Sequence, residues 1–415
     1  NKFAQENYPI YLYINMVQTT GQEFLECLER ATAWEPGMPR KERPLHEAMR
    51  LFDGRFQDTK DTIVIIDEIQ DSAKVYSLIR QFAREFSCHF VVTGSYLGKT
   101  LSKEYFQPVG DLDIMTLDTL TFEEFLDAGG KRDLYDAVDL LGGSPHKDYD
   151  ELKRYYDIYC QIGGYPAVVK TYLETKSLEA CRIELERVIH IFTEESQGYF
   201  DDILDINLFE QLLPAVARTM IREKKGSEDL ISELSKIVYK QESNRFSKRS
   251  INQAIAWLYR SHILDFCGKA NDCNPTDVSA NSRFYFLDIG VCRSFLDIVG
   301  ADLPTLRSTI NENFVYIDLL KRVRSRKISG TAPMFGLYKE GEIDFLINSR
   351  ENYKTYGVEV KAGKSEGKTA QLLLKDGKVE AVYFLKGDTY GGASDRKITV
   401  PIYLVGRGQF DFVDK

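Results

Sequence analysis

Three charged side chains near the end of the chain have the types and the spacing that a metal-dependent phosphodiesterase needs. Asp344 lies in one apolar run, and Glu359 and Lys361 lie in the next, 355–361. Because side chains alternate along a strand, Glu359 and Lys361 share a face, and a turn near residues 350–352 would bring Asp344 alongside it. Two carboxylates can then hold Mg²⁺ or Mn²⁺, which prefer oxygen ligands, while Lys361 can orient the attacking water.

The same residues have a simpler interpretation. The solvent-exposed face of a half-exposed hairpin can consist of Asp344, Glu359 and Lys361. Glu359 and Lys361 can then form an ion pair that contributes little to stability. A site of this kind can also be a relic that binds nucleic acid without cutting it. The spacing alone leaves these alternatives open.

A second acidic pair follows a strand-like segment in the first part of the chain. Asp67 and Glu68 come directly after the apolar run 63–66. In an ATPase, such an Asp holds Mg²⁺ through its water shell, and the Glu that follows polarises the attacking water. The carboxyl end of a parallel strand suits this role because binding crevices open there. The alternative is an acidic strand end that caps the next helix.

The phosphate-binding loop that should accompany this pair is missing from the sequence. No Gly-x-x-x-x-Gly-Lys-[Ser/Thr] occurs, and segments 94–100 and 363–369 each have one residue too few between their glycines. That residue matters because the backbone N–H groups of the loop must wrap the phosphate. The chain also begins at Asn1, so we expect a fragment whose start is missing. We expect residues 1–415 alone to bind ATP weakly or not at all.

Alternating strands and helices must position these residues. Apolar runs at 10–15, 62–66 and 89–93 are separated by helical patterns, which predicts a parallel sheet covered on both faces. Farther along, helical spacing precedes a hairpin at 263–287, which predicts a winged helix. The expected fold is α/β with four domains: a P-loop-type ATPase core at 1–128, a helical lid at 129–210, a winged helix at 211–300 and a nuclease-like α/β domain at 301–415.

The amino-acid composition limits the kinds of partner that the protein can bind and indicates its cellular compartment. The net charge of −9 excludes a surface that is basic throughout, so DNA would need a local patch such as 321–327, which is otherwise a solvated helix end. The seven scattered cysteines include no Cys-x-x-Cys, which argues against a zinc site and for a reducing cytosol. No apolar run approaches the ~18 residues of a membrane span. No secretory leader is present either, so we expect a cytoplasmic protein without a membrane partner.

Six motifs together carry a resemblance to a known family. The chain resembles the prokaryotic AAA-type ATPases that have a C-terminal DUF4143 domain, and DUF4143 domains in turn resemble the PD-(D/E)xK nucleases, which have a restriction-endonuclease-like fold. The motifs, in order, are Ile65-Ile-Asp-Glu-Ile-Gln, Val91-Val-Thr-Gly-Ser, Leu120-Thr-Phe-Glu-Glu-Phe, Gly163-Gly-Tyr-Pro, Arg283-Phe-Tyr-Phe-Leu-Asp-Ile-Gly and Asn311-Glu-Asn-Phe-Val-Tyr.

The resemblance implies roles for particular residues. It makes Asp67 and Glu68 the Walker B pair, with the P-loop lying before Asn1. It places Ser95 where the family has a polar sensor of the nucleotide, although a turn-forming Ser after Gly is an equal alternative. It also makes Glu312 the acidic helix residue beside a nuclease-like metal site.

The family often has Gly-Arg ahead of the Leu-Thr-Phe-Glu-Glu-Phe motif, whereas this chain has Gly110-Asp111. A phosphate contact or a contact with a neighbouring subunit would then be lost or moved. This departure weakens the expectation of a ring, although a homo-oligomer remains an expected state for a protein of this kind.

The leading functional hypothesis is an enzyme that binds ATP and Mg²⁺. In it, ATP hydrolysis is coupled to a nuclease-like domain that binds or cleaves DNA, with Mg²⁺ or Mn²⁺ held by Glu312, Asp344 and Glu359. The alternative is a nucleotide-gated regulatory or binding protein whose nuclease-like domain is inactive and whose partner is a protein or RNA.

Overall fold

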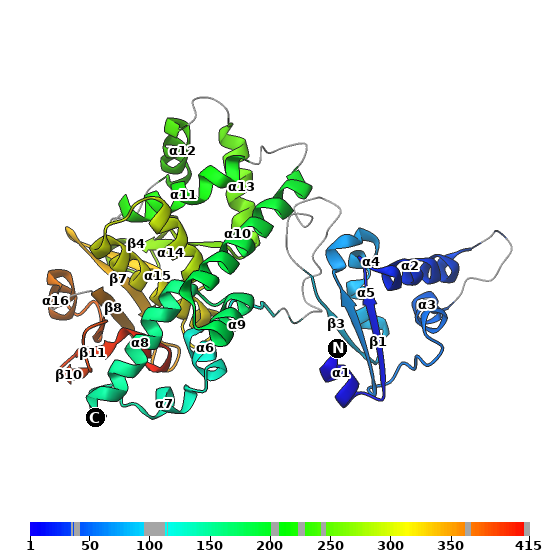
Figure 1. Ribbon diagram of the computed structural model, residues 1–415, viewed down its shortest axis with the longest axis horizontal. Coiled ribbons are helices and arrows are strands. Elements are labelled where there is room, and N and C mark those ends of the chain that lie inside the picture. Colours follow the sequence, from blue (N-terminus) through cyan, green and yellow to red (C-terminus); the bar gives the residue numbers. More distant parts are fainter. Residues whose placement is uncertain are drawn as a thin grey trace. The chain divides into compact units, whose positions relative to one another are not determined.

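The computed structural model describes residues 1–34, 36, 42–94, 113, 115–200, 207–222, 229–241, 246–361 and 367–410. The chain divides into two compact units, Asn1–Thr116 and Leu117–Lys415. Figure 1 shows both units, coloured from blue at the N-terminus to red at the C-terminus. Each unit is described below by itself.

The first unit is built on a parallel sheet. Its strands are β1 (Ile10–Asn15), β2 (Thr62–Asp67) and β3 (His89–Val92), in the spatial order β1-β2-β3. Both strand pairings, β1 with β2 and β2 with β3, are parallel, and Asn15 lies opposite Asp67 at the carboxyl edge. The parallel α/β arrangement that the alternating apolar runs predict is therefore present.

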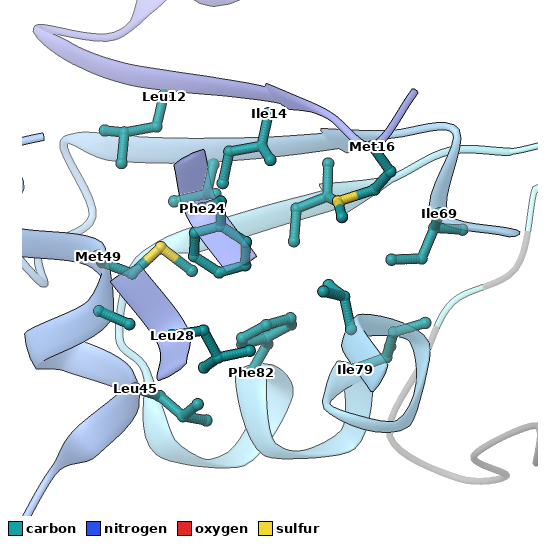
Figure 2. Packing of buried hydrophobic residues seen from close by; sticks show 14 of the residues in the cluster. Leu12, Ile14, Met16, Phe24, Leu28, Leu45, Met49, Ile69, Ile79 and Phe82 are labelled. Carbon is teal, nitrogen blue, oxygen red and sulfur yellow. The ribbon is translucent and has the colours of Figure 1, made fainter. Parts of the chain in front are cut away.

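Helices cover this sheet and form its hydrophobic core. Leu12 and Ile14 of β1 pack with Phe24 and Leu28, and all four are buried (Figure 2). Phe82 also belongs to this cluster and lies on the helix expected between β2 and β3. The helices of the unit are α1 (Lys2–Asn7), α2 (Thr19–Thr32), α3 (Pro44–Phe52), the 3₁₀ turn η1 (Ile69–Asp71), α4 (Ala73–Ser77) and α5 (Ile79–Glu85).

The second unit is built on one mixed sheet of eight strands, in the order β10-β11-β9-β8-β7-β6-β4-β5. The hairpin expected in a winged helix forms β4 and β5, but β4 also pairs in parallel with β6, where Gly268 lies opposite Met334. Strands from both sides of the boundary expected at residue 300 thus share one sheet. The strands are β4 (Leu264–Ala270), β5 (Val278–Phe286), β6 (Met334–Tyr338), β7 (Gly341–Asn348), β8 (Thr355–Lys361), β9 (Val382–Lys386), β10 (Gly392–Ser394) and β11 (Lys397–Pro401).

The described residues of 129–200 and 207–210 are mostly helical, as their spacing predicts, and the role of this segment as a lid stays a prediction. The helices of the second unit are α6 (Phe122–Ala128), α7 (Arg132–Ala137), α8 (His146–Ile162), α9 (Pro166–Thr175), α10 (Leu178–Phe200), α11 (Asn207–Arg222), α12 (Leu230–Gln241), α13 (Lys248–Arg260), η3 (Asn271–Cys273), α14 (Ile289–Ile298), α15 (Leu303–Arg324), α16 (Lys368–Lys375) and η4 (Ile402–Arg407). Within the described ranges, none of the helices of the chain is both long and apolar enough to cross a membrane.

Three of the sequence motifs meet in a buried junction of the second unit. Asp288 caps α14 by accepting hydrogen bonds from the N–H groups of Gly290 (2.9 Å) and Val291 (3.1 Å). The same carboxylate accepts a bond from the Gly164 N–H at 2.8 Å, and Leu120 N–H donates to the Gly164 carbonyl at 2.8 Å. Burial raises the pKa of Asp288 despite these donors. The motifs around Leu120, Gly164 and Asp288 therefore have a structural role in joining three segments.

Candidate functional sites

The acidic pair of the first unit stands at the carboxyl end of β2. Asp67 is the last residue of the strand, and its Oδ2 accepts hydrogen bonds from Tyr13 Oη at 2.6 Å and from Asn15 Nδ2 at 3.5 Å. Its Oδ1 accepts the Glu68 N–H at 3.1 Å. The hydrogen bond to Asp67 is the main reason why the pKa of Tyr13 is raised. The strand partner β1 thus fixes the direction of this carboxylate.

Glu68 leaves the strand in a left-handed conformation, with φ of 54°, which is uncommon for a residue other than glycine. Its Oε2 accepts a bond from Gln70 Nε2 at 2.5 Å. The Ile69 N–H bonds to the Thr93 carbonyl at 3.1 Å, so this turn is tied to the end of β3. Backbone strain held in place at a strand end is typical of functional sites.

The residues at this edge fit a hydrated magnesium ion. An ionised carboxylate offers about four lone-pair positions, and Asp67 uses three of its acceptor positions on protein donors at the distances given above. One position therefore remains for a water of an ion. Ser95 and the rest of the near-match segment 94–100 lie outside the described residues, apart from Gly94.

The structure brings Asp344, Glu359 and Lys361 of the second unit together. Strands β7 and β8 are antiparallel, and Phe345 lies opposite Val358, so the next pair in this register is Asp344 with Glu359. Lys361 Nζ lies 2.6 Å from Glu359 Oε1. The Val360 N–H donates to Asp344 Oδ2 at 2.6 Å. Both acids are buried, with exposed fractions of 8% for Asp344 and 3% for Glu359.

Glu312 on α15 lies beside this group and is bound by two residues that the sequence analysis did not select. Arg283 Nη1 lies 3.3 Å from Glu312 Oε1, and Tyr285 Oη donates to the same oxygen at 2.5 Å. Arg283 Nη2 also contacts Glu342 Oε2 at 2.8 Å. The sequence could have identified Glu342 as a residue of this site, because it lies two residues before Asp344 and therefore on the same face of β7.

Burial and the repulsion between neighbouring carboxylates raise the pKa values of three acids in this cluster, Asp344, Glu359 and Glu342. Burial first, and the neighbouring Glu359 second, raise the pKa of Asp344 well above its ordinary value. Burial also raises the pKa of Glu359 and that of Glu342, despite the nearby cations. For Lys361, burial lowers the pKa, but the carboxylates of Asp344 and Glu359 outweigh this effect and raise it. The cluster therefore favours bound protons, or another cation, over free negative charge.

A cleft of about 420 Å³ opens onto these residues. Its walls include Arg283, Glu342, Asp344 and Lys361 from the sheet, Glu312 from α15 and Met220 from α11. A volume of this size lies within the usual range for small-ligand sites. The cleft therefore gives access to Glu312, Glu342 and Asp344, whereas Glu359 is not among its lining residues.

The described conformation leaves only part of the acidic cluster available to a metal ion. Among the residues that the structure describes, no group of three or more His, Cys, Asp or Glu side chains is arranged to hold a metal. Glu312 and Glu342 face Arg283 instead. Glu359 Oε2, by contrast, is buried and has no hydrogen-bond partner within the described ranges. This orphaned oxygen is the feature that a bound cation would satisfy.

Comparisons with known proteins assign a class to the first part of the chain. Residues 12–126 match the family model described as AAA domain, which indicates a nucleotide-binding ATPase domain of the AAA type, as the sequence predicts. Residues 153–302 match a domain of unknown function, DUF8612, so the model that matches this part of the second unit is not DUF4143. No curated protein matches the chain.

One solved structure similar to this chain is that of protein VC1899 from Vibrio cholerae. The two share 11% sequence identity over 83% of this chain and 88% of that chain, with a TM-score of 0.18. A score this low carries no argument about fold or function.

Proposed function

We propose that this protein is a cytoplasmic prokaryotic enzyme in which hydrolysis of Mg-ATP by the AAA domain is coupled to a nuclease-like C-terminal region. That region binds a divalent cation and binds or cleaves DNA. The observation that carries the proposal is the grouping of Asp344, Glu359 and Lys361 on two neighbouring strands, where Asp344 and Lys361 line an open cleft. All seven cysteines are free, which suits a reducing compartment.

Each residue of this group has a distinct part in the proposed reaction. Asp344 and Glu359 hold the cation, which when bound polarises a phosphoryl oxygen of the substrate. Lys361, on the same face of β8 as Glu359, orients the attacking water or stabilises the developing negative charge. The unpartnered Glu359 Oε2 supports this assignment, because a buried carboxylate oxygen rarely lacks a partner. Glu312 completes the acidic cluster from α15.

In the AAA domain, Asp67 binds the magnesium ion through water and Glu68 polarises the water that attacks ATP. Ser95, which follows β3 by three residues in the sequence, senses the terminal phosphate. The position of Asp67 and Glu68 at the carboxyl edge of a parallel sheet supports these roles.

Cleavage of DNA tests the nuclease-like assignment. We expect the protein to cut plasmid or single-stranded DNA with Mg²⁺ or Mn²⁺ and not with EDTA, and we expect Asp344→Asn to remove this activity. Asp395→Asn is the matched control because Asp395 is exposed on the β10–β11 turn, away from the cluster. If Asp344→Asn cuts as fast as the parent, the assignment of the site is wrong.

A second function is favoured by the ion pairs in the cluster. Lys361 is bound to Glu359, and Arg283 to Glu312 and Glu342, so the charges can neutralise one another without a metal. On this reading the region binds a partner without cutting it, under control of the nucleotide. Folded parent protein that binds DNA or RNA but never cleaves it, with either metal, would favour this alternative.

The Walker B assignment predicts the effect of removing one charge. In a chain that also carries a P-loop, Glu68→Gln should lower ATP turnover by about 10²–10⁴-fold, the usual contribution of a positioned base, while ATP binding is kept. Steady-state phosphate release and nucleotide binding would be measured on the same preparations. Glu85→Gln, at an exposed position on α5, is the control. Turnover that is unchanged by Glu68→Gln would contradict the assignment.

A further inference from the structure

Arg283 lies among the carboxylates of the second unit as a permanently bound cation. Its guanidinium reaches from β5 to Glu342 on β7 and to Glu312 on α15, at 2.8 Å and 3.3 Å. It stacks on the Phe335 ring of β6, with 3.8 Å between the guanidinium carbon and the ring centroid. The residue is only 6% exposed. Because an arginine side chain is not deprotonated in proteins, this positive charge is always present.

The contacts divide the four carboxylates into two pairs. Glu312 and Glu342 are the partners of Arg283, whereas Asp344 and Glu359 lie side by side on the neighbouring strands β7 and β8. Lys361 supplies the other cation, through Glu359 Oε1. With every group ionised, the cluster then has two negative charges in excess, which is the charge that one divalent cation balances.

An independent observation points to a ligand at the second pair, Asp344 and Glu359; the first pair is Glu312 and Glu342. Glu359 is 3% exposed, and its Oε2 has no hydrogen-bond partner among the residues that the structure describes. Leaving such an oxygen buried and unpaired costs free energy. Among the described residues, the buried oxygens that lack a hydrogen-bond partner include none of Glu312 or Glu342, and Tyr285 Oη and Arg283 both contact Glu312 Oε1.

We infer that Arg283 takes the place of a second metal ion, so that the cluster binds one divalent cation, through Asp344 and Glu359. This inference rests on the proposed function, because it concerns the metal of the same site. Sites for Mg²⁺ commonly use only one or two carboxylates and complete the coordination with water and substrate phosphate. Arg283 is therefore a positioning residue that sets the number of ions, and removing its charge opens a second cation site between Glu312 and Glu342.

Counting bound Mn²⁺ ions by electron paramagnetic resonance tests this inference without any measurement of cleavage. All proteins are the full chain and carry Asp67→Asn, which removes the metal ligand proposed in the AAA domain. We expect one Mn²⁺ per chain in this parent and none after Asp344→Asn. Arg283→Met keeps an unbranched apolar side chain without the charge and should bind two ions, with the dipolar broadening of neighbouring Mn²⁺ centres. Arg283→Lys keeps a cation and should bind one.

The possible counts separate the two ideas. If the parent binds one ion that Asp344→Asn removes, and folded Arg283→Met also binds one, the proposed metal site stands and the role of Arg283 is wrong. If the parent binds no ion, the proposed metal site itself fails. If Arg283→Met does not fold, Mn²⁺ is counted in Glu342→Gln instead. The variant should still bind one ion, because Glu342 pairs with Arg283 and is not a metal ligand. Loss of the ion would overturn the inference.

Discussion

Lys361→Ala is expected to lower the rate of DNA cleavage by about 10³-fold, within the range of a positioned acid, base or charge stabiliser. Lys361 Nζ lies 2.6 Å from Glu359 Oε1, on the face of β8 that borders the cleft. Binding of Mn²⁺ should be kept or become tighter, because the carboxylate of Glu359 loses its competing cation. Single-turnover cleavage at saturating Mn²⁺ and calorimetric titration of Mn²⁺ would be measured side by side.

The split between the two measurements distinguishes a chemical role from a structural one. Lys354→Ala is the matched control, since Lys354 pairs with Glu380 at 2.6 Å just before the same strand, away from the cleft. It should leave both measurements unchanged. If Lys361→Ala cleaves normally, Lys361 has no part in the reaction. If it loses Mn²⁺ binding as well as cleavage, Lys361 maintains the shape of the site instead.

Gly164→Ala is expected to destabilise the second unit by about 3 kcal/mol or more, at the upper end of the cost of forcing extra atoms into a packed site. A Cβ at this position would lie 2.0 Å from the Leu120 carbonyl oxygen, which is backbone and itself held by the Tyr159 hydroxyl at 2.7 Å. Relief would require moving Leu120 or breaking the Gly164–Asp288 bond. Either change loosens the junction of three segments.

Tryptophan fluorescence can follow this unit alone. The chain has two tryptophans, and Trp257 is buried in α13 of the second unit, whereas Trp34 belongs to the first. In a Trp34→Phe background, urea unfolding monitored at Trp257 should shift to lower urea for Gly164→Ala. Gly387→Ala is the control, because its Cβ would meet no atom within 4 Å. Equal midpoints for the two variants would show that the junction does not constrain Gly164.

Local patterns were sufficient for the three strands of the first unit and for the grouping of the charged residues, but they did not predict β6, β10 or β11. The apolar runs at 10–15, 62–66 and 89–93 became β1, β2 and β3, although β3 is not buried on both faces as predicted, since Val91 is 46% exposed. The period of two along a strand places Glu359 and Lys361 on one face, and a short turn between β7 and β8 brings Asp344 to it. These relations depend only on neighbours in the sequence.

The pairing of strands that are far apart in the sequence could not be predicted from local patterns. Nothing near Gly268 indicates that β4 pairs with β6, more than sixty residues away, since edge pairing depends on backbone groups that every sequence has. The partners of Glu312 were missed for the same reason. Arg283 and Tyr285 alternate on β5, and only the tertiary structure brings them to Glu342 on β7, two strands removed in the sheet, and to Glu312 on α15.

The shared sheet also decides where the chain can be cut. A fragment that begins at residue 301 would remove β4 and leave the backbone N–H and C=O groups of β6 without a neighbour on that side. Bare strand edges of this kind recruit strands from other molecules and promote aggregation. The hairpin β4–β5 thus acts as a protective border for the C-terminal strands, and a soluble fragment of this region must include it.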